Sequence, residues 1–266
     1  MIDIHCHILP GLDDGSNNIE ETLGIVRQLQ EAGFKTLLAT PHVLEGRDLL
    51  TPQEILAAIE NVQKSLKGAE ISVEVLPGAE NYIFPDMAKW ARDQRLMTLG
   101  NTGKYLLLEL PMLEIPHYTD QVFFELQVAG LTPVLAHPER NRGLVENPER
   151  LLDWAKRGIL FQLDLRSLSG KYGPEPKELA NLMLHSDLIH LIGSDAHRVA
   201  RSPLSYLEAL ESVREIVGEE RFKDVTLSNP QAILDGKPLK SENDRDYLLR
   251  EPVKKKKKSG FWSFFR

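Results

Sequence analysis

The sequence predicts an α/β protein whose parallel strands close into a barrel. Apolar runs alternate with longer segments of helical period along most of the 266 residues, and this alternation indicates βαβ units. Seven such units fit a closed barrel better than an open, doubly wound sheet, and the length lies within the range of single-domain α/β barrels. No predicted strand leads into a G-x-G-x-x-G or P-loop motif, which disfavours nucleotide-binding folds.

The predicted elements alternate in order along the chain. Strands are expected at residues 2–6, 35–40, 71–77, 104–109, 132–136, 159–165 and 188–193. Helices are expected between them, at 18–32, 52–66, 85–94, 117–129, 147–157, 174–185 and 203–217. Asn17 with Glu20, and Thr51 with Glu54, have the spacing of a capping box. Three glycines stand where helix C-caps are expected: Gly33, Gly130 and Gly158.

Two regions differ in composition. Residues 1–236 carry the strand–helix pattern and are predicted to form the barrel, whereas 237–266 begin as a polar linker and end in the basic and aromatic tail VKKKKKSGFWSFFR. The net charge is −7 although this tail is basic, and an acidic barrel region argues against nucleic acid as a partner. A single cysteine, no secretory signal and no long apolar run predict a cytoplasmic protein.

Side chains that bind metals stand at the predicted strand ends, where parallel α/β barrels place their active sites. They are His5, His7, His42, Glu80, Glu109, His137, Asp164, Asp195 and His197. An isolated histidine at a strand end is more often a hydrogen-bonded structural residue than a metal ligand. The remaining histidines are expected on helices or within a strand, and we interpret them as structural: His117, His185 and His190. A buried carboxylate such as Glu109 after YLLL is costly unless it is paired or metal-bound. The joint placement therefore predicts a metal site.

The residue types at these positions indicate the chemistry. Imidazoles and carboxylates without a thiolate suit Mn, Fe or Zn, and Glu80 could bridge two ions that hold a hydroxide for displacement at phosphorus. Cys6 is the alternative nucleophile, but it is expected on the opposite face of its strand from His5 and His7. Cysteine phosphatases also need an arginine six residues later, where this chain has Leu12. The nucleophile is therefore predicted to be metal-activated water, with Cys6 as a packed residue.

The motifs H-x-H, TPH, GAE, LLLE, HPER and GSDAH, in this order, resemble the polymerase-and-histidinol-phosphatase (PHP) superfamily. The opening HCHILPGLDDGS and the segment HPERN are similar to its bacterial branch of metal-dependent protein-tyrosine phosphatases, which work with capsule or exopolysaccharide tyrosine kinases. The resemblance extends from residue 1 to about 235. It implies a distorted seven-stranded barrel of PHP type with two or three metal ions, manganese being preferred and iron or zinc the alternatives.

The resemblance also implies roles for individual residues. The implied ligands are His5, His7, Glu80 and Asp195 for the first ion, Glu80, Glu109 and His137 for the second, and His42 and His197 for a third. Some members have a further histidine where this chain has DLRSLSG, so the third ion is expected to be weakly held or completed by water. Arg140 and Arg201 match the phosphate-binding arginines, and a phosphate dianion favours such bidentate donors. Asp13 and Asp14 are assigned to the turn before the first helix, with a hydrogen bond to a ligand histidine as the alternative.

The predicted function is a phosphomonoesterase acting on phosphotyrosine in a partner, a membrane-bound tyrosine kinase, with His42 or His197 able to protonate the leaving group. The alternatives are a small-molecule phosphatase such as histidinol-phosphatase, and a non-catalytic scaffold, which would lack ligands at the strand ends. The tail pairs a lysine run with four aromatic residues, which predicts contact with the anionic inner face of the membrane. Docking into a protein groove and a solvated end are the alternatives for the tail.

Overall fold

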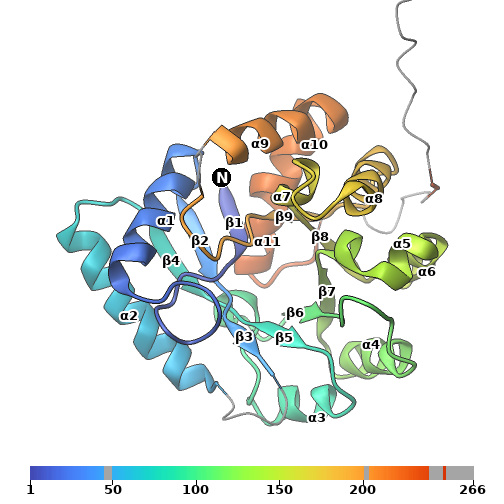
Figure 1. Ribbon diagram of the computed structural model, residues 1–266. Helices are drawn as coiled ribbons and strands as arrows, with labels where there is room; N and C mark the ends of the chain where they lie inside the picture. Colours follow the sequence, from blue (N-terminus) through green and yellow to red (C-terminus); the bar gives the residue numbers. More distant parts are fainter. Residues whose placement is uncertain (45–49, 201–203, 240–247, 250–266) are drawn as a thin grey trace, which may run out of the picture.

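The computed structural model describes residues 1–44, 50–200, 204–239 and 248–249, and its parallel strands form a curved, barrel-like wall surrounded by helices (Figure 1). The strands are β1 (Ile2–Cys6), β2 (Thr36–Ala39), β3 (His42–Val43), β4 (Glu74–Pro77), β5 (Glu80–Tyr82), β6 (Tyr105–Glu109), β7 (Thr132–Ala136), β8 (Leu160–Asp164) and β9 (Leu191–Gly193). They form two sheets, of order β1-β2-β4 and β3-β5-β6-β7-β8-β9, and the described pairs are parallel.

The predicted barrel type is confirmed and the seven predicted strands are present, but two further short strands, β3 and β5, follow the predicted strands 35–40 and 71–77. Pro41 separates β2 from β3, because proline has no N–H to continue the ladder. Gly78 separates β4 from β5, and a Cβ added there would lie 2.9 Å from Thr40 Cγ2, so only glycine lets these two chain segments approach so closely. These two interruptions give the barrel its distortion.

The two sheets are joined by backbone hydrogen bonds on one side and by the continuous chain on the other. Where β1 leaves its sheet, Asp195 N donates to His5 O (2.8 Å) and His7 N donates to Ala196 O (2.9 Å). On the other side, the chain continues from β2 into β3 and from β4 into β5, and Glu80 N donates to Pro41 O (3.1 Å) next to the β3–β5 pair. His7, His42, Glu80 and Asp195 therefore lie where the two sheets meet, whereas Glu109 and His137 lie at strand ends within the six-stranded sheet.

The seven predicted helices are present with slightly different ends. They are α1 (Ile19–Glu31), α2 (Pro52–Gly68), α3 (Met87–Arg92), α4 (Thr119–Val128), α6 (Glu149–Lys156), α8 (Pro174–His185) and α9 (Leu204–Val217). Shorter ones were not predicted, because one or two turns show no clear period: η1 (Leu99–Asn101), η2 (Pro138–Arg140), α5 (Arg142–Glu146), α7 (Leu165–Leu168), α10 (Glu219–Lys223), the π-helix η3 (Asp224–Ser228) and α11 (Asn229–Leu234). Among the described residues, no helix combines the length and apolar character needed to cross a membrane.

One of the two predicted capping boxes is confirmed. Glu54 N donates to Thr51 Oγ1 and Thr51 N donates to Glu54 Oε2, at 3.3 and 2.8 Å. The prediction for α1 is wrong by one residue, because Asn18 is the residue with extended backbone and its Oδ1 accepts from Glu21 N at 2.9 Å. The three predicted C-cap glycines have positive φ, at 97° for Gly33, 82° for Gly130 and 80° for Gly158.

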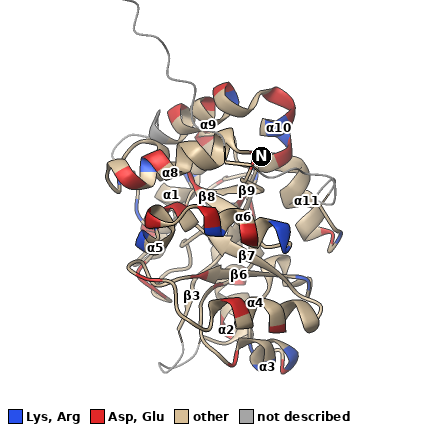
Figure 2. Cartoon of the chain, turned by 90° about the vertical axis from the view of Figure 1, so that its right-hand side faces the viewer, with Lys and Arg blue, Asp and Glu red and all other residues tan. Residues whose placement is uncertain are grey.

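Apolar side chains form an inner cluster within the strands and a larger cluster beneath the helices. Leu107 of β6 belongs to the inner cluster, whereas its neighbours Leu106 and Leu108 belong to the larger one. Since side chains alternate along a strand, Glu109 at the end of β6 faces the same interior as Leu107. Charged residues lie mainly on the outer helices, as Figure 2 shows for α6 and α10. The interior thus ends, at the carboxyl ends of the strands, in a polar site.

Candidate metal centre

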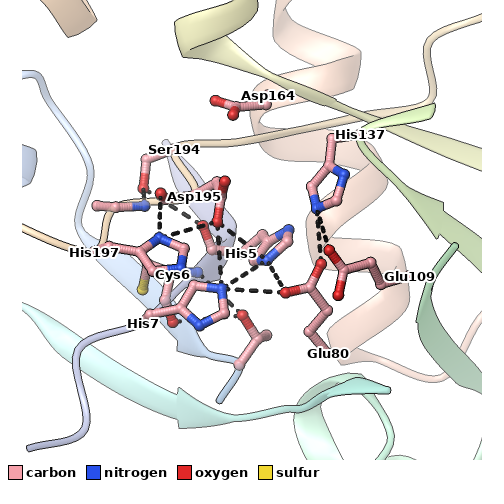
Figure 3. Close-up of polar contacts among 12 residues, drawn as sticks. His5, Cys6, His7, Glu80, Glu109, His137, Asp164, Ser194, Asp195 and His197 are labelled. Atoms are coloured by element: carbon pink, nitrogen blue, oxygen red, sulfur yellow. Dashed lines mark hydrogen bonds and ion pairs between the residues drawn. The ribbon is translucent and has the colours of Figure 1, made fainter. Parts of the chain in front are cut away.

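The first group of predicted ligands lies at the end of β1. His5 Nε2 and His7 Nε2 are 3.0 Å apart, and both face the carboxylates of Glu80 and Asp195 (Figure 3). Glu80 Oε2 is 3.1 Å from His5 Nε2 and 3.3 Å from His7 Nε2. Asp195 Oδ1 is 3.6 and 3.3 Å from the same two nitrogens. The four side chains are buried and converge on one point.

A second group extends from Glu80 across the cavity. His137 Nε2 lies 2.8 Å from Glu80 Oε1 and 3.8 Å from Glu109 Oε1. His42 Nδ1 lies 3.2 Å from Glu80 Oε2 and 3.5 Å from Glu109 Oε2. Glu80 is thus in contact with histidines of both groups, as a bridging carboxylate requires.

A third group lies nearer the solvent and contains Asp14, which the sequence had placed in the turn before the first helix. His42 Nε2 and His197 Nε2 lie 3.5 and 3.3 Å from Asp14 Oδ1, and the ring of His197 stacks on that of His7 with centroids 3.9 Å apart. The side chain of Asp14 is 70% exposed, whereas those of His42 and His197 are about one fifth exposed. Asp14 could therefore supply a further ligand atom beside those of the two histidines.

Neighbouring polar groups orient the two histidines of β1. His5 Nδ1 is 2.8 Å from Gln162 Oε1, and His7 Nδ1 is 2.7 Å from Asp13 Oδ2. Both partner atoms are acceptors, so each Nδ1 donates and each Nε2 is left with its lone pair facing the cluster. Asp13 also accepts from the backbone N of His42, at 3.1 Å. Asp13 therefore accepts a hydrogen bond from a predicted ligand histidine, which confirms the alternative that the sequence left open.

The backbone is also specialised at the site. His137 and Asp195 have φ of 30° and 45°, a left-handed conformation that side chains other than glycine rarely adopt and that is typical of functional positions. Asp3 helps to hold the turn at Asp195, because its Oδ1 accepts from the backbone N of Ser194 (2.9 Å) and of His5 (3.2 Å). Burial raises the pKa of Asp3 to about 6 despite these hydrogen bonds.

The electrostatics of the cluster favour bound cations. Burial opposes a charged imidazole at His5, but the Glu80 and Asp195 carboxylates outweigh it and raise the pKa of His5 to about 9. Burial and the adjacent Glu80 charge raise the pKa of Glu109 to about 8. Three buried atoms of the cluster have no hydrogen-bond partner among the described residues: Glu80 Oε2, Asp195 Oδ1 and His42 Nδ1. The raised pKa values mean that protons occupy part of this cluster when no metal is bound, and divalent metal ions would displace those protons and bind the same nitrogen and oxygen atoms.

Two arginines lie against the Asp195 side of the cluster. Arg140 Nη1 donates to Asp195 Oδ2 at 2.7 Å, and Arg166 Nη2 donates to the same oxygen. The Arg140 guanidinium also lies over the ring of Tyr172, 4.3 Å from its centroid. Arg166 and Tyr172 were not predicted, although Arg166 stands two residues after the strand-end Asp164 in DLRSLSG. The predicted Arg201 lies outside the described residues.

The strand-end carboxylate Asp164 has a different role from the ligand residues. Its Oδ1 is 3.3 Å from Arg166 Nε, and its Oδ2 is 3.6 Å from Arg140 Nη1. Glu139, in the HPER motif, is buried and accepts from Asp164 N (3.0 Å) and Ser167 Oγ (2.8 Å). Asp164 and Glu139 therefore fix the arginines and α7. His117, His185 and His190 belong to none of the three groups formed by described residues.

A cavity of about 740 Å³ opens above the centre. It is lined by the predicted ligands other than His5 and His7, together with Asp14, Tyr82 and Arg140. A parallel α/β barrel with buried imidazoles and carboxylates at its strand ends, and a cavity above them, defines a metal-dependent hydrolase. Residues 1–235 match the family described as capsular polysaccharide synthesis, CpsB/CapC. The chain belongs to this family, which confirms the predicted resemblance.

Several known proteins resemble the chain over most of its length. Tyrosine-protein phosphatase YwqE of Bacillus subtilis is 34% identical over 262 residues, covering 98% of this chain and 100% of YwqE. CapC of Staphylococcus aureus is 33% identical over 224 residues, covering 80% of this chain and 88% of CapC. A crystal structure also matches, with a TM-score of 0.85 at 33% identity, and the match covers 96% of this chain and 100% of that one. It comes from work on YwqE of Bacillus subtilis and CpsB of Streptococcus pneumoniae, which are described there as metal-dependent tyrosine phosphatases.

A more distant match shows the fold alone. Histidinol phosphate phosphatase of Lactococcus lactis, whose crystal structure contains zinc, L-histidinol and phosphate, has a TM-score of 0.53 at 14% identity and covers 82% of this chain and 93% of that one.

Proposed function

We propose that the protein is a metal-dependent phosphatase that hydrolyses phosphotyrosine in proteins. The observation that carries the proposal is a pair of buried carboxylate oxygens, Glu80 Oε2 and Asp195 Oδ1, that have no hydrogen-bond partner among the described residues. Both residues line the same cavity as Arg140. Metal ions and a phosphate dianion would satisfy both the acceptors and the arginine. The names of the relatives YwqE and CpsB support phosphotyrosine as the group that is cleaved.

Two or three divalent ions, with manganese preferred over iron or zinc, would occupy the centre. The proposed ligands are His5, His7, Glu80 and Asp195 for the first ion, Glu80, Glu109 and His137 for the second, and Asp14, His42 and His197 for the third. Divalent ions at such a site supply a hydroxide nucleophile at neutral pH and positive charge for the phosphoryl oxygens. The third site is the most open to solvent, so we expect its ion to exchange most readily.

The chain's own residues would bind and orient the substrate. Arg140 offers planar donors that match two phosphoryl oxygens, and Arg201 is proposed to do the same from the resemblance alone. His42 and His197 line the cavity, and either could give a proton to the departing phenolate when the third ion is not bound. Phenolate is a good leaving group, so this proton would contribute less than the charge that binds the phosphoryl group.

We propose that the substrate is a phosphorylated tyrosine kinase of capsule or exopolysaccharide synthesis, bound to the membrane. Residues 237–266 would act as a linker and tether, with the lysine run and aromatic residues of VKKKKKSGFWSFFR on an anionic leaflet. The enzyme would then be cytoplasmic and peripheral at the inner membrane face.

The test is an assay of metal-depleted protein with each ion restored. The substrates are p-nitrophenyl phosphate, a phosphotyrosine peptide and histidinol phosphate. We expect no turnover without metal, the highest kcat/KM with Mn²⁺, and a preference for the phosphotyrosine peptide over histidinol phosphate. A preference for histidinol phosphate would assign the protein to the small-molecule phosphatases. Turnover that survives complete metal removal would contradict the proposed mechanism.

A further inference from the structure

A second cavity, of about 490 Å³, adjoins the metal centre and differs from it in charge. Its lining comes from α7 and the segment after it, from the segment after β9 and from α9: Arg166, Ser169, Lys171, His197, Arg198, Val199, Ala200 and Tyr206. Three of these residues carry positive charge and none is acidic, although the chain as a whole has a net charge of −7. A basic pocket in an acidic protein indicates an anionic ligand.

The cations of this basic pocket are not equally available. Arg166 is paired with Asp164 and Asp195, and Arg198 lies 3.4 Å from Glu21 and donates to the backbone O of Gly15. Lys171 forms no ion pair with any described residue. Its ammonium lies 5.5 Å from the ring centroid of Tyr172, and burial followed by repulsion from Arg166 lowers its pKa. The Asp164 and Asp195 carboxylates act in the opposite direction, but both are paired with Arg166, so Lys171 is the cation of the pocket that remains available to an anion.

The position of the pocket relates it to the substrate. His197 lines both the basic pocket and the cavity of the metal centre, so the two share a wall. Tyr172 lies next to Lys171 and packs against Arg140. Figure 1 shows α7 and α9 adjacent to each other beside the segment that follows β9. An extended peptide rises about 3.3 Å per residue, so a side chain within a few residues of a phosphotyrosine in the metal centre reaches the pocket.

We propose that this basic pocket binds an anionic side chain, a carboxylate or a second phosphate, that flanks the phosphotyrosine of the substrate. The inference rests on the proposed phosphatase function and adds a determinant of its specificity. Lys171 is the specificity residue, because it is the cation without an ion-pair partner among the described residues. It makes no contact with the proposed metal ligands, so its replacement leaves the chemistry in place.

The experiment compares kcat/KM of the full-length, Mn²⁺-loaded enzyme on matched phosphotyrosine peptides. One peptide has neutral flanking residues, others carry glutamate at one to three positions on either side, and another carries a second phosphotyrosine. The variants are Lys171→Ala and Lys171→Glu. Lys104→Glu is the control, because Lys104 is exposed and precedes β6, at the end of the barrel opposite the site. Turnover of p-nitrophenyl phosphate, which has no flanking residues, measures the hydrolytic step alone.

We expect the parent to prefer a peptide with an acidic flank by about fivefold, the effect of one favourable ion pair at a partly exposed site. Lys171→Ala should remove this preference and Lys171→Glu should reverse it, with kcat on p-nitrophenyl phosphate unchanged and Lys104→Glu equal to the parent. A preference for either anion supports the pocket, and the ratio of the glutamate and phosphate peptides identifies which it takes. Equal cleavage of acidic and neutral peptides by the parent, or a preference that survives Lys171→Glu, overturns the inference but leaves the phosphatase function. Failure to cleave any phosphotyrosine peptide overturns both.

Discussion

Replacing Glu80 by alanine tests the centre most directly. The Glu80 carboxylate lies within 3.3 Å of four imidazoles, at 3.1 Å from His5, 3.3 Å from His7, 3.2 Å from His42 and 2.8 Å from His137. No other described carboxylate contacts both the first and the second group so closely. Its removal takes a ligand from two proposed ions at once.

The size of the effect follows from this position. Removing a residue that only hydrogen-bonds to a metal ligand typically lowers metal affinity or activity by about 10–100-fold. Glu80 is among the proposed ligands themselves, so we expect Glu80→Ala to lower kcat/KM by more than about 100-fold. The assay uses p-nitrophenyl phosphate and a phosphotyrosine peptide with Mn²⁺, with bound metal counted by elemental analysis. Bound metal should fall together with activity.

Two control variants separate this effect from damage to the fold. Glu60→Ala removes an exposed carboxylate from α2, and we expect parental kinetics. Cys6→Ser changes the buried residue between the two histidines of β1, and it should keep most of the turnover. The reasoning is refuted if Glu80→Ala is folded and keeps parental kcat/KM. It is also refuted if Cys6→Ser is folded, metal-loaded and inactive, since the sulfur would then be the nucleophile.

The remaining predictions concern the arginine, the third site and the tail. Arg140→Lys should lower kcat/KM by about tenfold although the charge is kept, because one ammonium cannot donate two parallel hydrogen bonds; kinetics equal to the parent would exclude Arg140 from the site. His42→Ala should lose less metal and activity than His137→Ala, as measured by elemental analysis and turnover, because the third group is the most exposed; equal losses would mean that the ions are wrongly assigned. The intact protein should co-sediment with anionic vesicles at low salt, bind less as salt rises, and lose binding when shortened to residues 1–252; an intact protein that ignores such vesicles would refute the tether.

The clustering of the candidate ligands could be predicted from the sequence because it depends on local rules. Strand ends of a parallel barrel meet on one rim, so His137 and Glu109 could be placed together from their strands alone. Asp14, Arg166 and Tyr172 lie in loops or short helices, and only the tertiary path of the chain brings them to the rim. The short strands β3 and β5 were not predicted, because two or three residues are too few to show a period. The close approach of the chain segments at Gly78 is not visible in the sequence either.

The buried position of Cys6 has a consequence for how the enzyme responds to oxidants. Cys6 is fully buried, its Sγ donates to Leu38 O at 3.3 Å, and burial together with nearby carboxylates raises its pKa well above the ordinary value. Oxidants and alkylating reagents attack exposed thiolates, and this thiol is neither exposed nor ionised. Phosphatases with a nucleophilic cysteine can be switched off by peroxide. This protein offers peroxide no such thiol, so its control over tyrosine phosphorylation would persist in cells under oxidative stress.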